Sequence, residues 1–122
     1  MRRSIHLLVA GAAVVIGVAA IPLAGAAARP AAATKTVTVK AGEMYFKLST
    51  KTLAKPGRVT FAVKNAGHLV HDFKIAGKVT PMLKPGKSAN LTVTFRKKGS
   101  YRYQCTVPGH AAGGMKGVFT VR

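Results

Sequence analysis

Short runs of alternating apolar and polar residues, separated by turn residues, fill the chain from residue 36 to its end. Residues 36–39, 59–63 and 89–95 are the clearest runs, and in each of them every second side chain falls on the same face of a strand. We expect these inward faces to form one core that includes Val59, Phe61, Val63, Leu91, Val93 and Phe95. The spacing predicts an all-β sandwich or barrel of about seven or eight strands, with no helix among them.

Two of the predicted strands carry residues that can bind a metal. In residues 69–75, His71 shares the apolar face, and the alternation predicts a strand over the whole segment. Residues 101–105 alternate in the same way, so Cys105 is expected at the end of a strand whose inward residues lead down to it. Residues 116–121 are expected to form the last strand.

The first 33 residues have a different composition from the rest of the chain. Arg2 and Arg3 precede an uncharged run, 7–28, that is rich in alanine and glycine. This pattern is typical of a secretory signal peptide, although 22 uncharged residues are also long enough to span a bilayer as an anchor helix. We expect residues 1–33 to be such a signal peptide or membrane anchor with a linker, and residues 34–122 to be the folded domain. The domain is then exported and is periplasmic, extracellular or tethered to the outer face of the cytoplasmic membrane.

The chain is strongly basic. Lysine and arginine total 20 against two acidic residues, Glu43 and Asp72, which gives a formal net charge of +18. Such a charge favours acidic protein partners, or an anionic membrane or cell-wall surface, with fast and salt-sensitive association. The basic residues are scattered singly, apart from 96–98, and no nucleic-acid motif accompanies them, so we expect no nucleic-acid role. We expect a monomer.

Cys105 is the sole cysteine, so the chain cannot form an internal disulfide. An accessible thiolate outside the cytoplasm is prone to oxidation, because such thiolates react readily with oxidants. A buried, inert cysteine is the alternative. The residues that follow Cys105 favour a thiolate that binds a metal ion.

Three side chains that bind soft metals follow one another at equal spacing: Cys105, His110 and Met115. Pro108 and several glycines lie between them, which predicts a turning loop. Thiolate and thioether ligands select copper, and two histidines, one cysteine and a weak axial methionine form a site suited to one-electron transfer. Such a site requires a second histidine.

Two upstream histidines are candidates for this ligand. His71 lies on the apolar face of its predicted strand, whereas His68 follows Gly67 in a turn. We therefore predict that His71 is the ligand and that His68 is a solvated turn residue, which could replace His71 if the strand register shifted.

The loop Cys105-x4-His110-x4-Met115 and the segment Gly-His-x2-His-Asp-Phe over 67–73 resemble small cupredoxins of the plastocyanin, azurin and rusticyanin kind. The resemblance covers residues 34–122. It implies a Greek-key β-sandwich with one copper ion, Cu(I) or Cu(II), in a type 1 site formed by His71, Cys105, His110 and Met115.

The resemblance also suggests how the site is supported and reached. In such proteins the edge of the histidine corresponding to His110 reaches the surface through an apolar patch and serves as the electron port. Val107, Pro108 and 111–113 are small or apolar enough to form it. Lys74 and Lys116 would guide an acidic partner to this patch.

Four residues are expected to support the ligands from behind. Pro108 stiffens the loop, and Asn65 combines turn chemistry with bracing of the site. Relatives commonly carry an asparagine where this chain has Asp72, and that side chain bonds a hydroxyl residue next to the cysteine. Asp72 therefore either accepts a bond from Thr106 or points to solvent and pairs with a nearby lysine.

We expect a carrier of single electrons between extracytoplasmic redox proteins, with an acidic cytochrome or oxidase as partner, rather than an enzyme. No second cluster of histidines is available in the sequence for a catalytic copper centre. The alternative is a copper-binding protein for storage, delivery or tolerance that has no electron-transfer partner. Met44 and Met82 are expected to pack in the core or at its rim.

Overall fold

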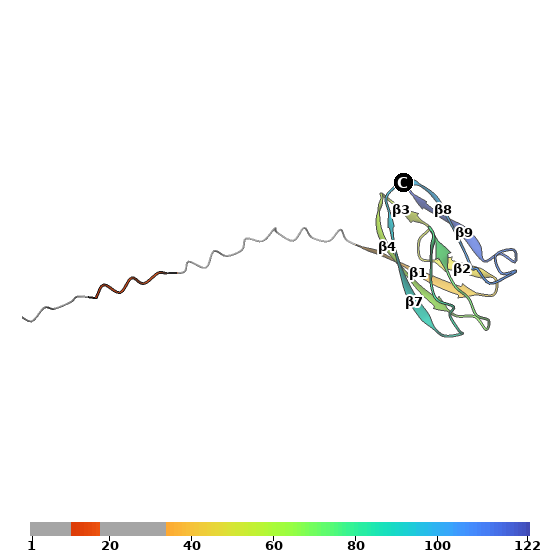
Figure 1. Ribbon diagram of the computed structural model, residues 1–122. Helices are drawn as coiled ribbons and strands as arrows, with labels where there is room; N and C mark the ends of the chain where they lie inside the picture. The colour runs from red at the N-terminus through yellow and green to blue at the C-terminus, as the bar shows by residue number, and fades with distance from the viewer. Residues whose placement is uncertain (1–10, 18–33) are drawn as a thin grey trace, which may run out of the picture.

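The computed structural model describes residues 11–17 and 34–122, and the second range forms a β-sandwich (Figure 1). Its strands follow one another along the chain as β1 (Lys35–Gly42), β2 (Tyr45–Leu48), β3 (Thr52–Leu53), β4 (Gly57–Asn65), β5 (Lys74–Ile75), β6 (Lys78–Val79), β7 (Ser88–Phe95), β8 (Gly99–Gln104) and β9 (Lys116–Val121). The all-β prediction is confirmed, and the described residues contain nine strands because three segments of two residues each also pair.

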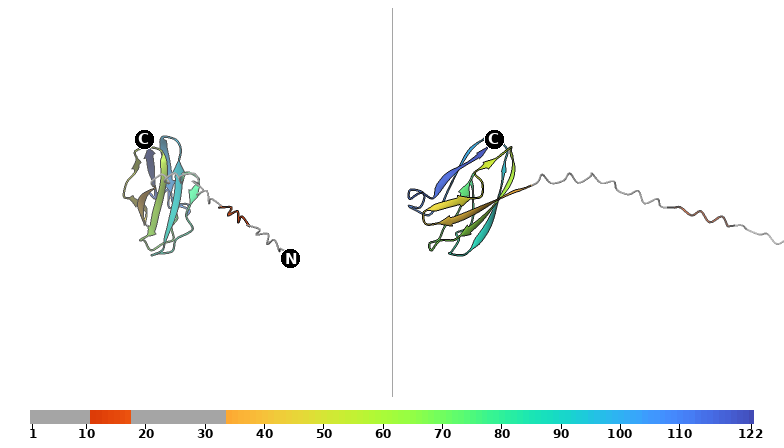
Figure 2. Two further views of the ribbon diagram at one scale, coloured as in Figure 1. Left: turned by 90° about the vertical axis from the view of Figure 1, so that its left-hand side faces the viewer. Right: turned by 180° about the vertical axis from the view of Figure 1, so that it is seen from behind.

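The strands form two sheets that pack face to face (Figure 2). One sheet has four strands in the order β2-β1-β4-β7, and the other has five in the order β3-β9-β8-β5-β6. β1 pairs parallel with β4, and β4 pairs antiparallel with β7 from Gly57 to Lys64. β8 and β9 form an antiparallel pair whose connecting loop is residues 105–115.

The core lies between the sheets and consists of the alternate residues that the sequence pattern predicts. Val59, Phe61 and Val63 of β4 are buried, as are Leu91, Val93 and Phe95 of β7. Phe61 lies at the centre, with ring centroids 5.3 Å from Phe73 and 5.4 Å from Phe119. Phe73 belongs to the histidine segment, so the aromatic core reaches to within two residues of His71.

The predicted strand over 69–75 is wrong for most of its length. Only Lys74–Ile75 forms a strand, and His71 makes an isolated antiparallel bridge with Leu83. Alternation fails at Asp72, which is buried together with His71 and Phe73. Two neighbouring inward side chains cannot belong to a regular strand, and Asp72 turns inward because its carboxylate binds the Thr106 segment.

Residues 11–17 carry no regular secondary structure and are exposed. The rest of the predicted signal peptide or anchor lies outside the described residues. Within residues 11–17 and 34–122, no helix is long and apolar enough to cross a membrane.

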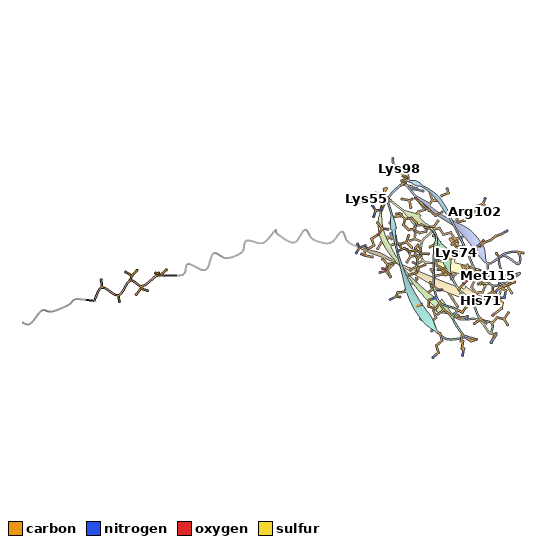
Figure 3. All side chains as sticks on the ribbon, viewed as in Figure 1. Lys55, His71, Lys74, Lys98, Arg102 and Met115 are labelled. Atoms are coloured by element: carbon orange, nitrogen blue, oxygen red, sulfur yellow. The ribbon has the colours of Figure 1, made fainter. Side chains whose placement is uncertain are left out.

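Several loops meet at one end of the sandwich. β1 ends there at Gly42, β4 at Asn65 and β8 at Gln104, and the loops that follow them lie together. Figure 3 labels His71 and Met115 at this end, and Lys55 and Lys98 at the other. The sheet therefore brings segments that are distant in sequence to a common place.

Candidate metal centre

The loop 105–115 begins with a tight turn. The His110 N–H donates to the Val107 carbonyl at 3.0 Å, and Pro108 and Gly109 occupy the two central positions. Gly109 has a φ of 83°, the left-handed value that a turn of this kind requires at its third residue. The Pro-Gly pair therefore fixes where His110 leaves the turn.

The same loop is closed by its own backbone. The Met115 N–H donates to the His110 carbonyl at 3.0 Å, and the Cys105 N–H donates to the Met115 carbonyl at 3.1 Å. All three residues are buried, with His110 the most exposed at 8%. The loop thus holds a thiol, an imidazole and a thioether in one compact unit.

His71 reaches this unit from the other side of the chain. Its backbone exchanges two hydrogen bonds with Leu83, at 3.1 Å and 2.7 Å, and its side chain is fully buried. The competing residue His68 is exposed and lies in the bend before it. The structure therefore places His71, and not His68, beside Cys105 and His110.

Asn65 fixes the loop that leads to His71. Its buried side-chain amide donates to the carbonyls of Leu69 and Leu83, both at 2.7 Å, and its Oδ1 accepts from the Gly67 N–H at 2.9 Å. The bracing role expected for Asn65 thus has a definite form, since one side chain joins the start of the loop to both sides of the His71 bridge.

Asp72 ties the two ligand-bearing segments together. Its Oδ1 accepts from the Thr106 N–H at 2.6 Å, and its Oδ2 accepts from the Thr106 hydroxyl. Asp72 is 2% exposed, so the alternative in which it points to solvent or pairs with a lysine is wrong. A carboxylate here holds the residue after Cys105 against the residue after His71.

Three donor atoms converge in the space between these segments. His71 Nδ1 lies 3.1 Å from His110 Nδ1, and Cys105 Sγ lies 4.0 Å and 3.6 Å from the same two nitrogens. Metal–donor bonds of about 2.0–2.3 Å in a trigonal plane place neighbouring donors roughly 3.5–3.8 Å apart. The observed separations bracket that range, so the residues fit a single ion.

The burial of Cys105 favours a bound metal ion in place of the thiol proton. Burial raises the pKa of Cys105, which disfavours a bare thiolate there. A bound metal ion offsets this cost because it stabilises the thiolate directly. Met115 is fully buried and forms a small cluster with Cys105 and Ala41. Met44 packs against this cluster.

Glu43 is a functional candidate that sequence reasoning missed. It lies between β1 and β2, and its Oε1 accepts from His71 Nε2 at 3.1 Å and from the N–H groups of His68 and Leu69, each at 2.7 Å. These hydrogen bonds lower the pKa of Glu43 from 4.5 to about 2, and the bond from the Leu69 N–H has the largest effect. The signal that could have found it is its rarity, since it is one of two acidic residues in the chain.

The surface beside His110 is partly apolar and partly basic. A groove with a volume of about 590 Å³ runs along β8 and β9 and is lined by Ala111, Ala112, Arg102 and Lys116 among others. Lys74 and Lys116 both lie opposite Gln104 in the sheet, one on each side of it. Met82 is 53% exposed, so it does not pack in the core, and of the two places predicted for it only the rim is left.

Known proteins resemble this chain in sequence and in fold. The family model described as "Cupredoxin-like domain" matches residues 13–121. The copper-resistant cuproprotein CopI of Pseudomonas aeruginosa is 27% identical, with 80% of this chain and 82% of that protein covered. The CopI protein of Rubrivivax gelatinosus is 28% identical over 75% of this chain and 69% of its own length.

Among solved structures, the dithionite-reduced auracyanin of the photosynthetic bacterium Roseiflexus castenholzii superimposes with a TM-score of 0.64 and 27% sequence identity. The match covers 75% of this chain and 99% of that one. The residues matched by the family model extend through both sheets and include every donor residue of the cluster. The chain belongs to the cupredoxin-like domain family, whose members bind copper.

Proposed function

We propose that this protein is a mononuclear type 1 copper protein that carries single electrons, in which His71, Cys105 and His110 would be the three strong ligands and Met115 a weak one. The observation that supports this most is the convergence of three buried donor atoms within 4.8 Å of one another. Two nitrogens and one thiolate with an axial thioether form the ligand set suited to electron transfer.

Copper supplies the one-electron change between Cu(I) and Cu(II), and the chain supplies a rigid cage. The ligand loop is closed by its backbone, the His71 segment is fixed by Asn65 and Leu83, and Asp72 joins the two. Rigid ligands move little when the charge changes, so the barrier to electron transfer is low. If Met115 supplies a fourth ligand, no open position is left for a substrate, which favours a carrier over an enzyme.

The surface around His110 is the proposed contact with a redox partner. The imidazole is 8% exposed, and its neighbours Ala111 and Ala112 are small, so a partner can approach its edge closely. Arg102 and Lys116 line the adjoining groove. We propose an acidic partner, such as a cytochrome or an oxidase domain, which these positive charges steer to the port.

The experiment is a Cu(II) titration of the purified domain in two forms, wild type and Cys105→Ser. We expect wild type to develop an intense thiolate-to-copper absorption band in the visible range with a 1:1 end point, and the variant to lack that band. Electron exchange with an acidic cytochrome is then expected to slow as salt is added. A wild-type protein that remains colourless with copper contradicts the proposal.

A second function is favoured by the two CopI relatives, whose names record copper resistance. The same four ligands could serve copper tolerance, delivery or storage without any redox partner. The two functions differ in kinetics. Rapid reversible exchange of electrons supports the carrier, whereas rapid transfer of Cu(I) to an acceptor protein, with slow electron exchange, supports copper handling. Either function is proposed for an exported domain, which rests on the uncharged segment after Arg2 and Arg3.

A further inference from the structure

The turn between β1 and β2 touches both ligand-bearing segments. We call residues 42–45 the hairpin tip. Glu43 of the tip binds the His71 loop through its carboxylate. Met44 faces the other segment, since a Cβ on Gly113 would lie 3.3 Å from Met44 Cγ and one on Gly114 would lie 3.0 Å from the Met44 carbonyl. The tip therefore contacts both segments, which the Asp72–Thr106 bonds also join.

The Glu43 carboxylate accepts its three hydrogen bonds through one oxygen. Oε1 accepts from the N–H groups of His68 and Leu69, both at 2.7 Å, and from His71 Nε2 at 3.1 Å. The two amide bonds fix the oxygen in place, and the third bond then fixes the imidazole. With Nε2–H donating outward, the lone pair of His71 Nδ1 faces Cys105 and His110.

The loop leaves a space that this carboxylate fills. A Cβ on Gly67 would lie 2.5 Å from Glu43 Oε1 and 2.7 Å from Oε2, closer than any side chain allows. Gly67 does not have a positive φ, so its lack of a side chain serves the approach of Glu43 and not the backbone conformation.

Charge adds a second effect to this geometry. The sequence has 20 basic residues and two acidic ones, Glu43 and Asp72. The Glu43 carboxylate binds the His71 imidazole, and the Asp72 carboxylate binds Thr106, the residue after Cys105. A carboxylate that accepts from a ligating imidazole orients the ring and makes it a stronger donor. Negative charge beside the site also stabilises the more highly charged Cu(II) state relative to Cu(I).

We propose that Glu43 is a positioning residue of the copper site, which selects the Nε2–H tautomer of His71, aims Nδ1 at the ion and lowers the reduction potential. The proposal rests on the ligand set proposed above. It assigns the hairpin tip a role in tuning copper, separate from the role of the ligands themselves.

Four variants separate geometry from charge. Glu43→Gln keeps an oxygen acceptor for the three N–H groups but removes the charge, and Glu43→Ala removes both. Gly67→Ala expels the carboxylate while Glu43 remains in the chain. Thr94→Lys adds the same unit of charge as Glu43→Gln, but in β7 opposite Arg58, at the end of the sandwich far from the site.

We expect Glu43→Gln to lose less copper affinity than Glu43→Ala and to have a higher reduction potential, whereas Thr94→Lys keeps the wild-type affinity and potential. Glu43→Ala and Gly67→Ala are expected to lose about 10- to 100-fold in copper affinity and to change the visible spectrum. If Glu43→Gln shifts the potential no more than Thr94→Lys does, or if Glu43→Ala keeps wild-type affinity, the proposal is overturned.

A metal-free measurement keeps this test independent of the proposed function. Nitrogen NMR of the imidazoles in the apo protein is expected to show the Nε2–H tautomer of His71 in wild type and in Glu43→Gln, and a mixture of tautomers in Glu43→Ala. An unchanged tautomer in Glu43→Ala overturns the positioning role even if wild type binds copper. A wild type that binds no copper refutes the proposed function, whatever the tautomers show.

Discussion

The two segments that supply the donor atoms are held in opposite ways. The loop 105–115 is closed by its own backbone hydrogen bonds and by a Pro-Gly turn, so most of what fixes it is contained in those residues. The His71 segment makes few contacts within itself. It depends on Asn65, Glu43, Leu83 and Thr106, which come from four other parts of the chain.

The site is therefore more sensitive to substitution around the His71 segment than within the ligand loop. A self-closed loop tolerates the loss of one contact, because the remaining bonds lie close in sequence and restore the turn. A segment held from outside loses its position when one distant partner is removed. We therefore expect substitutions around His71 to cost more stability than comparable substitutions within the ligand loop.

The largest effect is expected for Asn65→Ala. The substitution removes three hydrogen bonds, and the Leu83 carbonyl then keeps only the bond from the His71 N–H. We expect the free energy of unfolding of the apo protein to fall by about 3 kcal/mol. Urea unfolding measures it, with Asn90→Ala as the control because Asn90 is exposed in β7. If the two variants lower the free energy of unfolding equally, Asn65 does not hold the His71 segment in place.

A smaller effect is expected for Thr106→Val, which cuts one of the two bonds that join the segments. The Thr106 N–H still donates to Asp72, so only the hydroxyl contribution is lost. We expect a loss of about 1–2 kcal/mol, since the acceptor is charged. Thr106→Ser keeps a hydroxyl and should recover most of the loss in the same unfolding measurement. Failure of serine to do so would point to packing of the methyl group instead.

The smallest effect is expected inside the self-closed loop, for Gly109→Ala. Alanine at a φ of 83° is strained, at a cost of about 1 kcal/mol. The backbone bonds from Met115 and Cys105 remain, so we expect copper affinity and the visible spectrum to stay close to wild type. Thermal unfolding measures the loss of stability, and copper titration measures the affinity and the visible spectrum. A loss of stability as large as that of Asn65→Ala would remove the distinction between the two segments.

The same distinction explains what could be predicted from sequence. Strand alternation located Val59, Phe61 and Val63 in the core, and spacing alone indicated that Cys105 and His110 lie close together, because both patterns are local. The prediction of His71 as a ligand rests on a strand over 69–75, of which only Lys74–Ile75 forms. The choice agrees with the structure because His71 is still buried on the inward side.

What sequence could not give are contacts between distant segments. The approach of Glu43 to His71 depends on β1 extending to Gly42, so that the turn after it reaches the ligand end. The pairing of His71 with Leu83 depends on a connection without periodicity. The inward turn of Asp72 breaks the alternation that the prediction relied on, since a tertiary hydrogen bond outweighs a local pattern.

The parallel pairing of β1 with β4 sets the orientation of the domain. β1 starts at Lys35, beside Val59 near the beginning of β4, and runs toward the loops that hold the donor residues. The chain thus enters the sandwich on the side remote from the loop between β8 and β9 (Figure 1). A domain fixed to any surface by its amino-terminal side would hold its copper outward, where a freely diffusing protein can collide with the imidazole edge without meeting that surface.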